Sequence, residues 1–410
     1  MKTLSFDEAT TLSLALAAKH TLKEYEWISV FSALGRVLGE DITCKKNLPS
    51  YNNAALDGFA IKHSDCGKTL KIKTTILAGS VIEPCLGENE CYKIMTGAKV
   101  PDDADTIVPF EECLAYDESM AHIPLHVKHG NALRLRGEEQ LVSSILLEKG
   151  DCINSSSMAI LASQGITQIK VYKKLSIAVF STGDELKNPW DSASENEIYD
   201  INATALIGLF AEHGFDAHYC GVIPDNLEKA TAYFEEMKDY NALVTSGGVS
   251  MGEADYVEKA LQANGFEALF HGINIKPGKP TMLGSMGKTV VSSMPGNPLA
   301  AYVNAFLFLI PLFKRMQGQK NFNFQFVSAV NQETFRVKSG RVNLVLGLYE
   351  NDTFYVCNGN KYGSGMITPM YKSNALLITS EETVSIEMSK KVNIFLFKTP
   401  LSPNQGLFKN

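Results

Sequence analysis

Short apolar runs alternate with polar, helix-forming stretches between residues 176 and 313. Four of these runs are rich in β-branched and aromatic residues, which favour strands, and they span residues 176–181, 217–223, 242–246 and 290–293. The polar stretches between them are long enough for helices. This alternation predicts a three-layer α/β domain, in which helices cover both faces of a mostly parallel sheet.

Capping residues predict where the helices of this region begin. Asn202 is a good N-cap for a helix at 203–213, which would end at Gly214. Asp225 is expected to open the next helix. In parallel sheets of this kind, ligands bind at the carboxyl ends of the strands, so the loops before these helices are candidate sites.

The first 174 residues follow other patterns. Residues 1–40 predict mostly helix, and Ser5 and Glu8 fit a capping box at its start. Residues 45–138 contain short β-like runs separated by Gly, Pro and Asp clusters. Residues 139–174 suggest a capped helix followed by a strand.

The C-terminal segment, about residues 321–410, is predicted to be entirely β. A hairpin is expected around Glu350-Asn351-Asp352, and residues 392–397 form another predicted strand. Both a small barrel and a sandwich satisfy this pattern.

Length and charge narrow the classes of function. The chain has 410 residues, which is enough for about two to four domains. Its formal net charge is −7 and no basic run of five residues occurs, which argues against nucleic acid and against a membrane surface as partners. The longest apolar stretch, 299–313, is too short to span a bilayer and predicts a buried helix. Eight cysteines without a C-x-x-C pair favour a soluble protein of the reducing cytoplasm.

A glycine turn ends the apolar run at 242–246. Gly247 and Gly248 follow it directly, and Glu253 and Asp255 come soon after. The simplest interpretation is a turn, which from these residues alone is slightly favoured. The alternative is an anion site, in which backbone N–H groups approach a phosphate and a divalent cation lies between phosphate and acid.

Three more loops join this one at the predicted strand ends. STGDEL (181–186) carries hydroxyls and two acids, KPGKP (276–280) carries two lysines on a proline-stiffened turn, and MPGNP (294–298) places a proline at the first position of a helix. Each loop alone has an ordinary explanation as a cap, a turn or a solvated charge. Together, at one edge of a sheet, they favour a site for phosphate and a divalent metal.

Seven segments, in order, resemble one enzyme family. They read NNAALDGFAIK, IMTGAKVPDDAD, RGEEQL, FSTGDEL, SGGVSMGEADY, IKPGKP and MPGNP. As an ordered set they resemble molybdopterin molybdenumtransferase, the bacterial MoeA family, and they are similar to the E domain of gephyrin. The likeness covers about residues 5–400. The ALDGFA, MTGA and RGEE segments distinguish this family from the related molybdopterin adenylyltransferases.

The resemblance implies a reaction. Members of this family insert molybdenum from molybdate into adenylylated molybdopterin and release AMP in a step that needs a divalent cation. We therefore expect a transferase with these two substrates and with Mg²⁺ as cofactor. Two alternatives remain: an adenylyltransferase, which would need only the α/β domain, and a non-catalytic scaffold, against which the intact acids and lysines argue.

The resemblance also assigns site residues. The residues expected to bind nucleotide, pterin or molybdate near the sheet edge are Ser181, Thr182, Gly183, Ser246, Gly247, Gly248, Lys276, Lys279, Pro295 and Pro298. The expected catalytic residues are Asp57, Glu139, Glu185, Asp225 and Asp255. Glu185 and Asp255 are the expected metal ligands.

Other assignments concern the rest of the chain. Asp57 and Thr96 are expected to face the cleft of a partner subunit, although Asp57 with its glycine is also a common turn pair. Three positions depart from the family pattern: Glu139 stands where an Asp is usual, Ala300 stands where a Ser is usual, and Ser364 matches the family's serine only loosely.

The resemblance divides the chain into four domains and implies a homodimer. Residues 1–44 and 139–174 would form a discontinuous α+β domain, 45–138 an inserted β-rich domain, 175–320 a molybdopterin- and nucleotide-binding α/β domain, and 321–410 a C-terminal β-barrel-like domain. The clefts would be shared between subunits. A molybdopterin adenylyltransferase and recipient molybdoenzymes are further expected partners in the cytoplasm.

Overall fold

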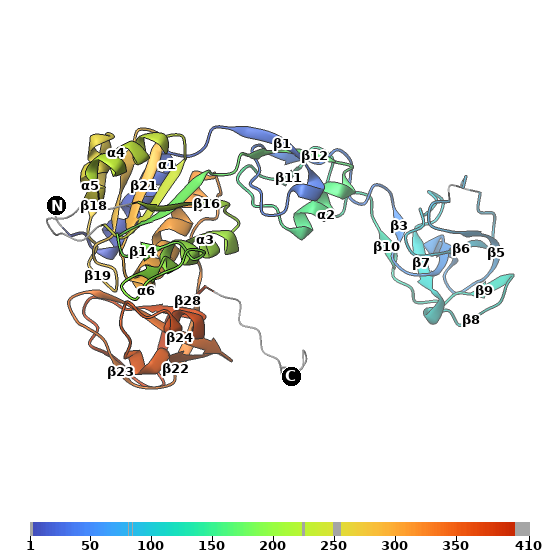
Figure 1. Cartoon of the computed structure of the whole chain (residues 1–410). Coiled ribbons are helices and arrows are strands. Elements are labelled where there is room, and N and C mark those ends of the chain that lie inside the picture. Colours follow the sequence, from blue (N-terminus) through green and yellow to red (C-terminus); the bar gives the residue numbers. More distant parts are fainter. Residues whose placement is uncertain (1–2, 81, 84, 224–225, 249–255, 398–410) are drawn as a thin grey trace.

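The computed structural model of this protein describes residues 3–80, 82–83, 85–223, 226–248 and 256–397. The chain is elongated (Figure 1): an α/β body packs against a β-rich end region, and an arm of two smaller parts extends away from the body. Mixed sheets in several separate units are thus present, as the sequence predicts. The exact domain boundaries stay predictions.

A sheet of six strands forms the centre of the body. Its order is β16 (Ala217–Ile223), β13 (Ile177–Thr182), β17 (Ala242–Ser246), β21 (Thr289–Met294), β20 (Met282–Met286) and β18 (Phe266–His271). The first four strands are parallel, and β20 and β18 are antiparallel to their neighbours. The carboxyl ends of β13, β17 and β21 therefore lie side by side.

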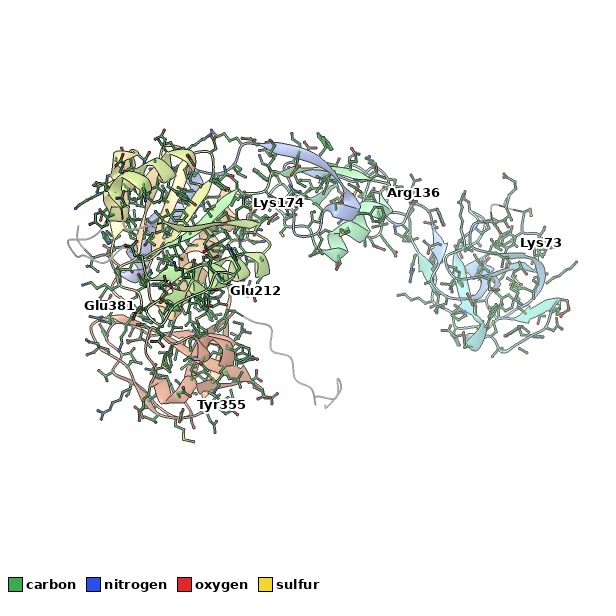
Figure 2. The ribbon with its side chains drawn as sticks, viewed as in Figure 1. Lys73, Arg136, Lys174, Glu212, Tyr355 and Glu381 are labelled. Carbon is green, nitrogen blue, oxygen red and sulfur yellow. The ribbon has the colours of Figure 1, made fainter. Side chains whose placement is uncertain are left out.

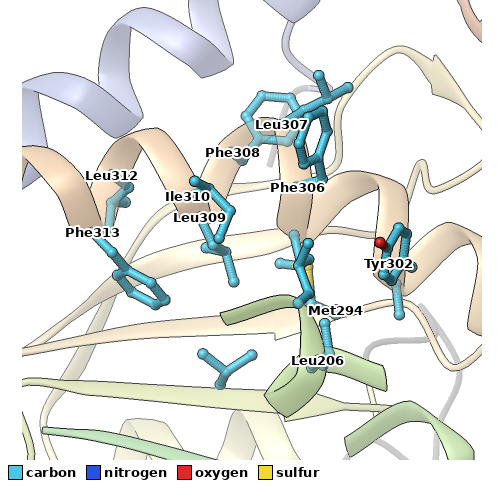
Figure 3. Packing of buried hydrophobic residues seen from close by; sticks show 14 of the residues in the cluster. Leu206, Met294, Tyr302, Phe306, Leu307, Phe308, Leu309, Ile310, Leu312 and Phe313 are labelled. Atoms are coloured by element: carbon cyan, nitrogen blue, oxygen red, sulfur yellow. The ribbon is translucent and has the colours of Figure 1, made fainter. Parts of the chain in front are cut away.

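Helices cover both faces of this sheet. One face carries α1 (Phe6–Lys19), α3 (Ile201–Glu212), α6 (Pro298–Asn304), a π-helical turn (Ala305–Leu309) and α7 (Ile310–Met316). The other carries α4 (Leu227–Glu236) and α5 (Tyr256–Ala263). Figure 3 shows side chains of the first core, where Leu309 and Phe313 point toward the sheet and Phe306 lies on the opposite side of the helix.

The helix from Pro298 to Met316 is the apolar segment that the sequence predicts to be buried. It is long and apolar enough to cross a membrane, yet 83% of its most apolar window is buried inside the protein. Burial of that kind is typical of a core helix.

The capping box at the start of the chain is confirmed, because Ser5 accepts from the Glu8 N–H at 3.2 Å while Glu8 accepts from the Ser5 N–H. The N-cap predicted at Asn202 is wrong. Asp200 caps α3, since its Oδ1 accepts from the Ala203 N–H at 3.1 Å.

The C-terminal region is a closed barrel of five strands rather than a sandwich. The strands β24 (Val342–Glu350), β25 (Thr353–Val356), β22 (Phe326–Asn331), β28 (Lys391–Leu396) and β26 (Ala375–Ile378) pair in this order, and β26 pairs back to β24. The predicted hairpin is present, with Glu350 opposite Thr353. Asn351 and Asp352 both have positive φ, as a tight hairpin turn requires. Smaller elements are β23 (Phe335–Arg336), β27 (Ser385–Ile386), a 3₁₀ turn (Cys357–Asn360) and α8 (Thr368–Lys372).

One short strand joins the body to the barrel. β19 (Ile275–Lys276) pairs in parallel with β24, so that Ile275 lies opposite Val342 and Lys276 opposite Asn343. The KPGKP turn, which belongs to the body by sequence, is thereby held against the barrel.

The part of the arm next to the body contains β1 (Tyr25–Ser29), β12 (Gln168–Tyr172), β2 (Ile42–Thr43), β11 (Ile145–Leu147) and α2 (Ser155–Ser163). The capped helix and strand predicted for 139–174 are confirmed, and Asn154 is the cap. The mostly helical prediction for 1–40 is wrong after Lys19. Residues 25–29 form a strand because they pair antiparallel with β12, and the Tyr25 and Tyr172 rings pack 4.8 Å apart.

The far part of the arm is a six-stranded sheet in the order β7, β4, β6, β5, β9 and β8. These strands span Thr106–Pro109, Gly58–Ile61, Glu90–Ile94, Thr69–Ile76, Met120–His122 and Ala115–Tyr116. A short ladder of β3 (Asn53–Ala54) and β10 (Leu133–Arg134) lies where the two parts meet.

Candidate active site between the α/β body and the barrel

A cavity of about 700 Å³ lies between the strand ends of the body and the barrel. Its walls come from the glycine loop after β17, the KPGKP turn, the PGNP turn and the barrel segments 341–345 and 360–364. Three of the four predicted loops therefore line one cavity. This location agrees with the general placement of ligands in open α/β sheets.

Two glycines form the part of the wall that follows β17. Gly247 has φ of 90° and Gly248 has φ of 64°, which side chains rarely adopt. A Cβ on Gly247 would lie 2.7 Å from the Thr182 carbonyl oxygen, and one on Gly248 would lie 2.9 Å from the Thr182 hydroxyl. The turn interpretation and the anion-site interpretation thus describe the same backbone, a close turn whose glycines leave room for a ligand. The Gly247 N–H is not free, because it donates to the Met294 carbonyl at 3.2 Å.

Thr182 lies beneath this glycine loop, at the end of β13. Its hydroxyl is buried and has no hydrogen-bond partner in the described part of the chain. Gly183 follows with φ of 142°, and the Glu185 carboxylate lies 2.6–2.9 Å from where its Cβ would be. Glu185 is exposed and does not line the cavity itself.

The KPGKP turn places two cations on the cavity wall. Lys276 and Lys279 are both exposed, and neither side chain forms an ion pair or a hydrogen bond with another described residue. The turn is fixed from below, since the Asn304 amide donates to the Gly278 carbonyl at 3.2 Å and to the Thr281 hydroxyl at 3.1 Å. A side chain at Gly278 would overlap that amide, so the close approach requires glycine.

The PGNP turn starts α6 as predicted, with Asn297 as N-cap and Pro298 in the first turn. Pro295 also lines the cavity, whereas Pro298 does not. One N–H group at this helix start is not free to bind a ligand. The Leu299 N–H donates to the Ser364 carbonyl at 3.1 Å, so Ser364, the loosest match to the family, contacts the start of α6 across the cavity wall.

The barrel adds residues that the sequence did not suggest. Arg341 lines the cavity, and its buried Nε has no hydrogen-bond partner in the described residues. Asn343 holds the adjoining segment by donating to the carbonyls of Lys338 and Arg341 at 2.9 and 3.0 Å. No local motif marks these residues. They reach the site through the β19–β24 pairing, which joins distant parts of the chain.

The cavity wall is cationic although the chain as a whole is acidic. Lys276, Lys279 and Arg341 are its charged residues, and no Asp or Glu is among the described residues that line it. The chain has a formal net charge of −7. A cleft lined by one sign of charge concentrates ions of the other sign, so this wall suits an anion.

The predicted metal ligands are only partly described. Asp255, an expected metal ligand, and Asp225, an expected catalytic residue, lie outside the described residues. No group of three His, Cys, Asp or Glu side chains suitable for a metal occurs among the residues that are described. The Thr182 hydroxyl beside the glycine loop and the Glu185 carboxylate beside Gly183 supply oxygen atoms, and oxygen is the ligand that Mg²⁺ prefers. These two groups fit such an ion but do not make a complete site.

The site residues predicted for the arm are distant from this cavity within one chain. Asp57 and Thr96 lie in the far part, while Glu139 is exposed close to the ladder between the two parts. Figure 2 marks the arm by Lys73 and Arg136, its junction with the body by Lys174, and the body by Glu212. The structure therefore divides the predicted site residues into two groups.

The Asp57 carboxylate is nevertheless held in a defined orientation by hydrogen bonds. Its Oδ1 accepts from the Thr96 backbone N–H at 2.6 Å and from the Thr96 hydroxyl at 2.7 Å. These two bonds lower the pKa of the Asp57 carboxyl below its usual value. The carboxylate is exposed, charged and fixed in direction, which an ordinary turn does not require.

Two family models match the chain. The MoeA N-terminal region (domain I and II) matches residues 4–165, and a probable molybdopterin binding domain matches residues 178–315. A molybdopterin molybdenumtransferase of Staphylococcus aureus is 30% identical over 316 residues, which are 75% of each chain. The chain belongs to the molybdopterin molybdenumtransferase family. It is accordingly an enzyme of the transferase class, and the resemblance seen in the sequence is confirmed.

Other members of the molybdenumtransferase family match nearly the whole chain. The molybdopterin molybdenumtransferase of Haemophilus influenzae is 29% identical over 398 residues, covering 95% of this chain and 98% of its own. The crystal structure of a molybdopterin biosynthesis MoeA protein from Pyrococcus horikoshii has a TM-score of 0.83 and 25% identity, covering 96% of this chain and all of that one.

Proposed function

We propose that this protein acts in molybdenum cofactor biosynthesis, where it inserts molybdenum from molybdate into adenylylated molybdopterin and releases AMP. The observation that carries the proposal is the cationic cavity, whose described lining includes two lysines, one arginine and no carboxylate. Both proposed substrates are anions, and both carry oxygen atoms that charged donors bind strongly.

Each wall has a proposed task. Lys276, Lys279 and Arg341 would hold the molybdate oxyanion or the substrate phosphates, and Arg341 is suited to bidentate contacts because its guanidinium is planar. The backbone of Gly247 and Gly248 would approach the nucleotide phosphate, with Thr182 donating from below. A bound Mg²⁺ would neutralise phosphate charge, and Glu185 with Asp255 would hold it.

We also propose that the enzyme is a homodimer with shared clefts. Asp57 is oriented by Thr96 but lies far from the cavity of its own chain, so its carboxylate would complete the cavity of a partner. Large apolar side chains lie exposed on the arm at Trp27, Phe31 and Leu34. Exposure of several large apolar side chains within one short segment is typical of a surface that another protein covers.

We propose a cytoplasmic location because all eight cysteines are free, which is typical of a reducing compartment.

The proposal is tested by AMP release from adenylylated molybdopterin. Purified protein should release AMP only when molybdate and Mg²⁺ are both present. Consumption of ATP with unmodified molybdopterin would instead support the adenylyltransferase alternative. Absence of both reactions, in a folded dimer that binds neither AMP nor molybdate, would favour the scaffold.

A further inference from the structure

The first turn of α3 contacts three of the strand-end loops at once. Asp200, the N-cap, accepts from the Ser181 hydroxyl at 2.8 Å and is almost fully buried. Two residues on, the Asn202 side-chain amide donates to the Ser246 hydroxyl and to the Gly296 carbonyl, both at 2.7 Å. Asn202 thus connects the glycine loop with the PGNP turn.

The orientation of this amide is determined by its neighbours. The Gly296 carbonyl can only accept, so the Asn202 nitrogen must face it. The Ser246 hydroxyl accepts from Asn202 and donates onward to the Pro295 carbonyl at 3.3 Å. Asn202 Oδ1 is buried and has no hydrogen-bond partner in the described part of the chain.

The two loops that Asn202 connects are already in contact. A Cβ built on Gly296 would lie 3.7 Å from the Gly247 Cα, which is van der Waals distance. Both glycines line the cavity. A small change in the spacing of these loops therefore changes the shape of the cavity directly.

We propose that Asn202 is a positioning residue that sets the spacing between the glycine loop and the PGNP turn, and thereby the geometry of the phosphate-binding wall. Its effect on turnover rests on the proposed function, whereas its effect on the loops does not. Asn202 need not touch the substrate, because it acts through Ser246 and Gly296.

Two substitutions test this role. Asn202→Asp keeps the size of the side chain but turns a carboxylate oxygen toward the Gly296 carbonyl, and Asn202→Ala removes both bonds without repulsion. Misplacement of a binding group by about 1 Å can reduce turnover by about a hundredfold. We expect both variants to raise the KM for adenylylated molybdopterin, or to lower kcat/KM, by about tenfold to a hundredfold, with Asn202→Asp the stronger.

A matched control is available at Asn264. Its buried amide also donates two hydrogen bonds, to the Thr231 and Ala260 carbonyls at 2.9 and 3.0 Å, but on the other face of the sheet. Asn264→Asp should lower the unfolding midpoint while leaving KM and kcat per folded molecule at wild-type values.

Hydrogen exchange separates this inference from the proposed function. In Asn202→Asp, peptides that contain Gly247 and Gly296 should exchange faster than in wild type, while they should not change in Asn264→Asp. Unchanged exchange in these peptides, together with wild-type KM and kcat, would overturn the positioning role. If wild-type protein releases no AMP, the proposed function fails, and the exchange result still decides the role of Asn202.

Discussion

The cavity beside the barrel presents three cationic side chains, whereas the far part of the arm presents the Asp57 carboxylate. The cavity wall holds Lys276, Lys279 and Arg341 on segments fixed by a buried amide and a strand pairing. On the arm, Asp57 is exposed and its carboxylate accepts two hydrogen bonds from Thr96. A cavity wall with three cations and no described carboxylate, and an oriented carboxylate on a distant surface, are the two halves expected of a site that closes between subunits.

The strongest test of this comparison is complementation. One variant carries Asp57→Asn, and the other carries Lys276→Ala with Lys279→Ala, and each homodimer should release almost no AMP. Mixed subunits should recover about a quarter of wild-type activity, because half of the dimers are mixed and each has one intact cleft. The recovered activity is measured as AMP release after the two variants are refolded together.

Subunit exchange must be verified in the same experiment, with two affinity tags. If mixed dimers form and activity stays at the level of the separate variants, the shared-cleft model is wrong for this protein. The cavity would then function within one chain, and Asp57 would be a structural turn residue.

The second prediction concerns the cavity alone. Lys279→Ala should raise the molybdate concentration needed for half-maximal AMP release by about tenfold to a hundredfold, because a lost charge-assisted contact costs about 1.5–3 kcal/mol. Lys288→Ala is the control, since this exposed lysine lies beside Asp239 and away from the cavity. Equal half-saturation in both variants would remove Lys279 from the oxyanion site.

The third prediction addresses how firmly the cavity wall is fixed. Gly278→Ala would drive a Cβ into the buried Asn304 amide, so it should lose about 1–3 kcal/mol of unfolding free energy beyond its control. The control is Gly287→Ala, which also has positive φ but meets no atom within 4 Å. Urea unfolding of the two variants measures the difference, and equal losses would mean that the turn yields easily.

The smallest predicted effect is a shift in the pKa of Asp57 on the arm. The Thr96 bonds favour the charged form of Asp57, so removing the hydroxyl in Thr96→Val should raise the pKa of that carboxyl. The backbone bond, which has the larger effect, remains, so the rise should be small. Asp57 would then be protonated at a higher pH than in wild type, and the acid limb of the pH–activity profile should move to higher pH. An unchanged acid limb would exclude Asp57 as the group that controls it.

Local chemistry was enough to predict several elements of this fold. The capping box at Ser5, the hairpin turn at Asn351 and Asp352, and the proline start of α6 all depend on residues a few positions apart. The three loops on one cavity followed from the rule for strand ends in parallel sheets.

The errors have a common physical cause in long-range contacts. Asp200 and Asn202 are both good N-caps, and the choice is made by Ser246 and Gly296, far along the chain, which engage the Asn202 amide. Residues 25–29 become a strand only because β12 pairs with them. Arg341 joins the site through a strand pairing that no local pattern encodes.

The parallel pairing of β19 with β24 has a consequence for how the protein is made. During synthesis the KPGKP turn leaves the ribosome well before Val342, and its edge has no partner until the barrel follows. The cavity can therefore form only after the barrel segments 341–345 and 360–364 have been made. A nascent or truncated chain that ends before the barrel would keep its lysines but lack the opposite wall of the cavity.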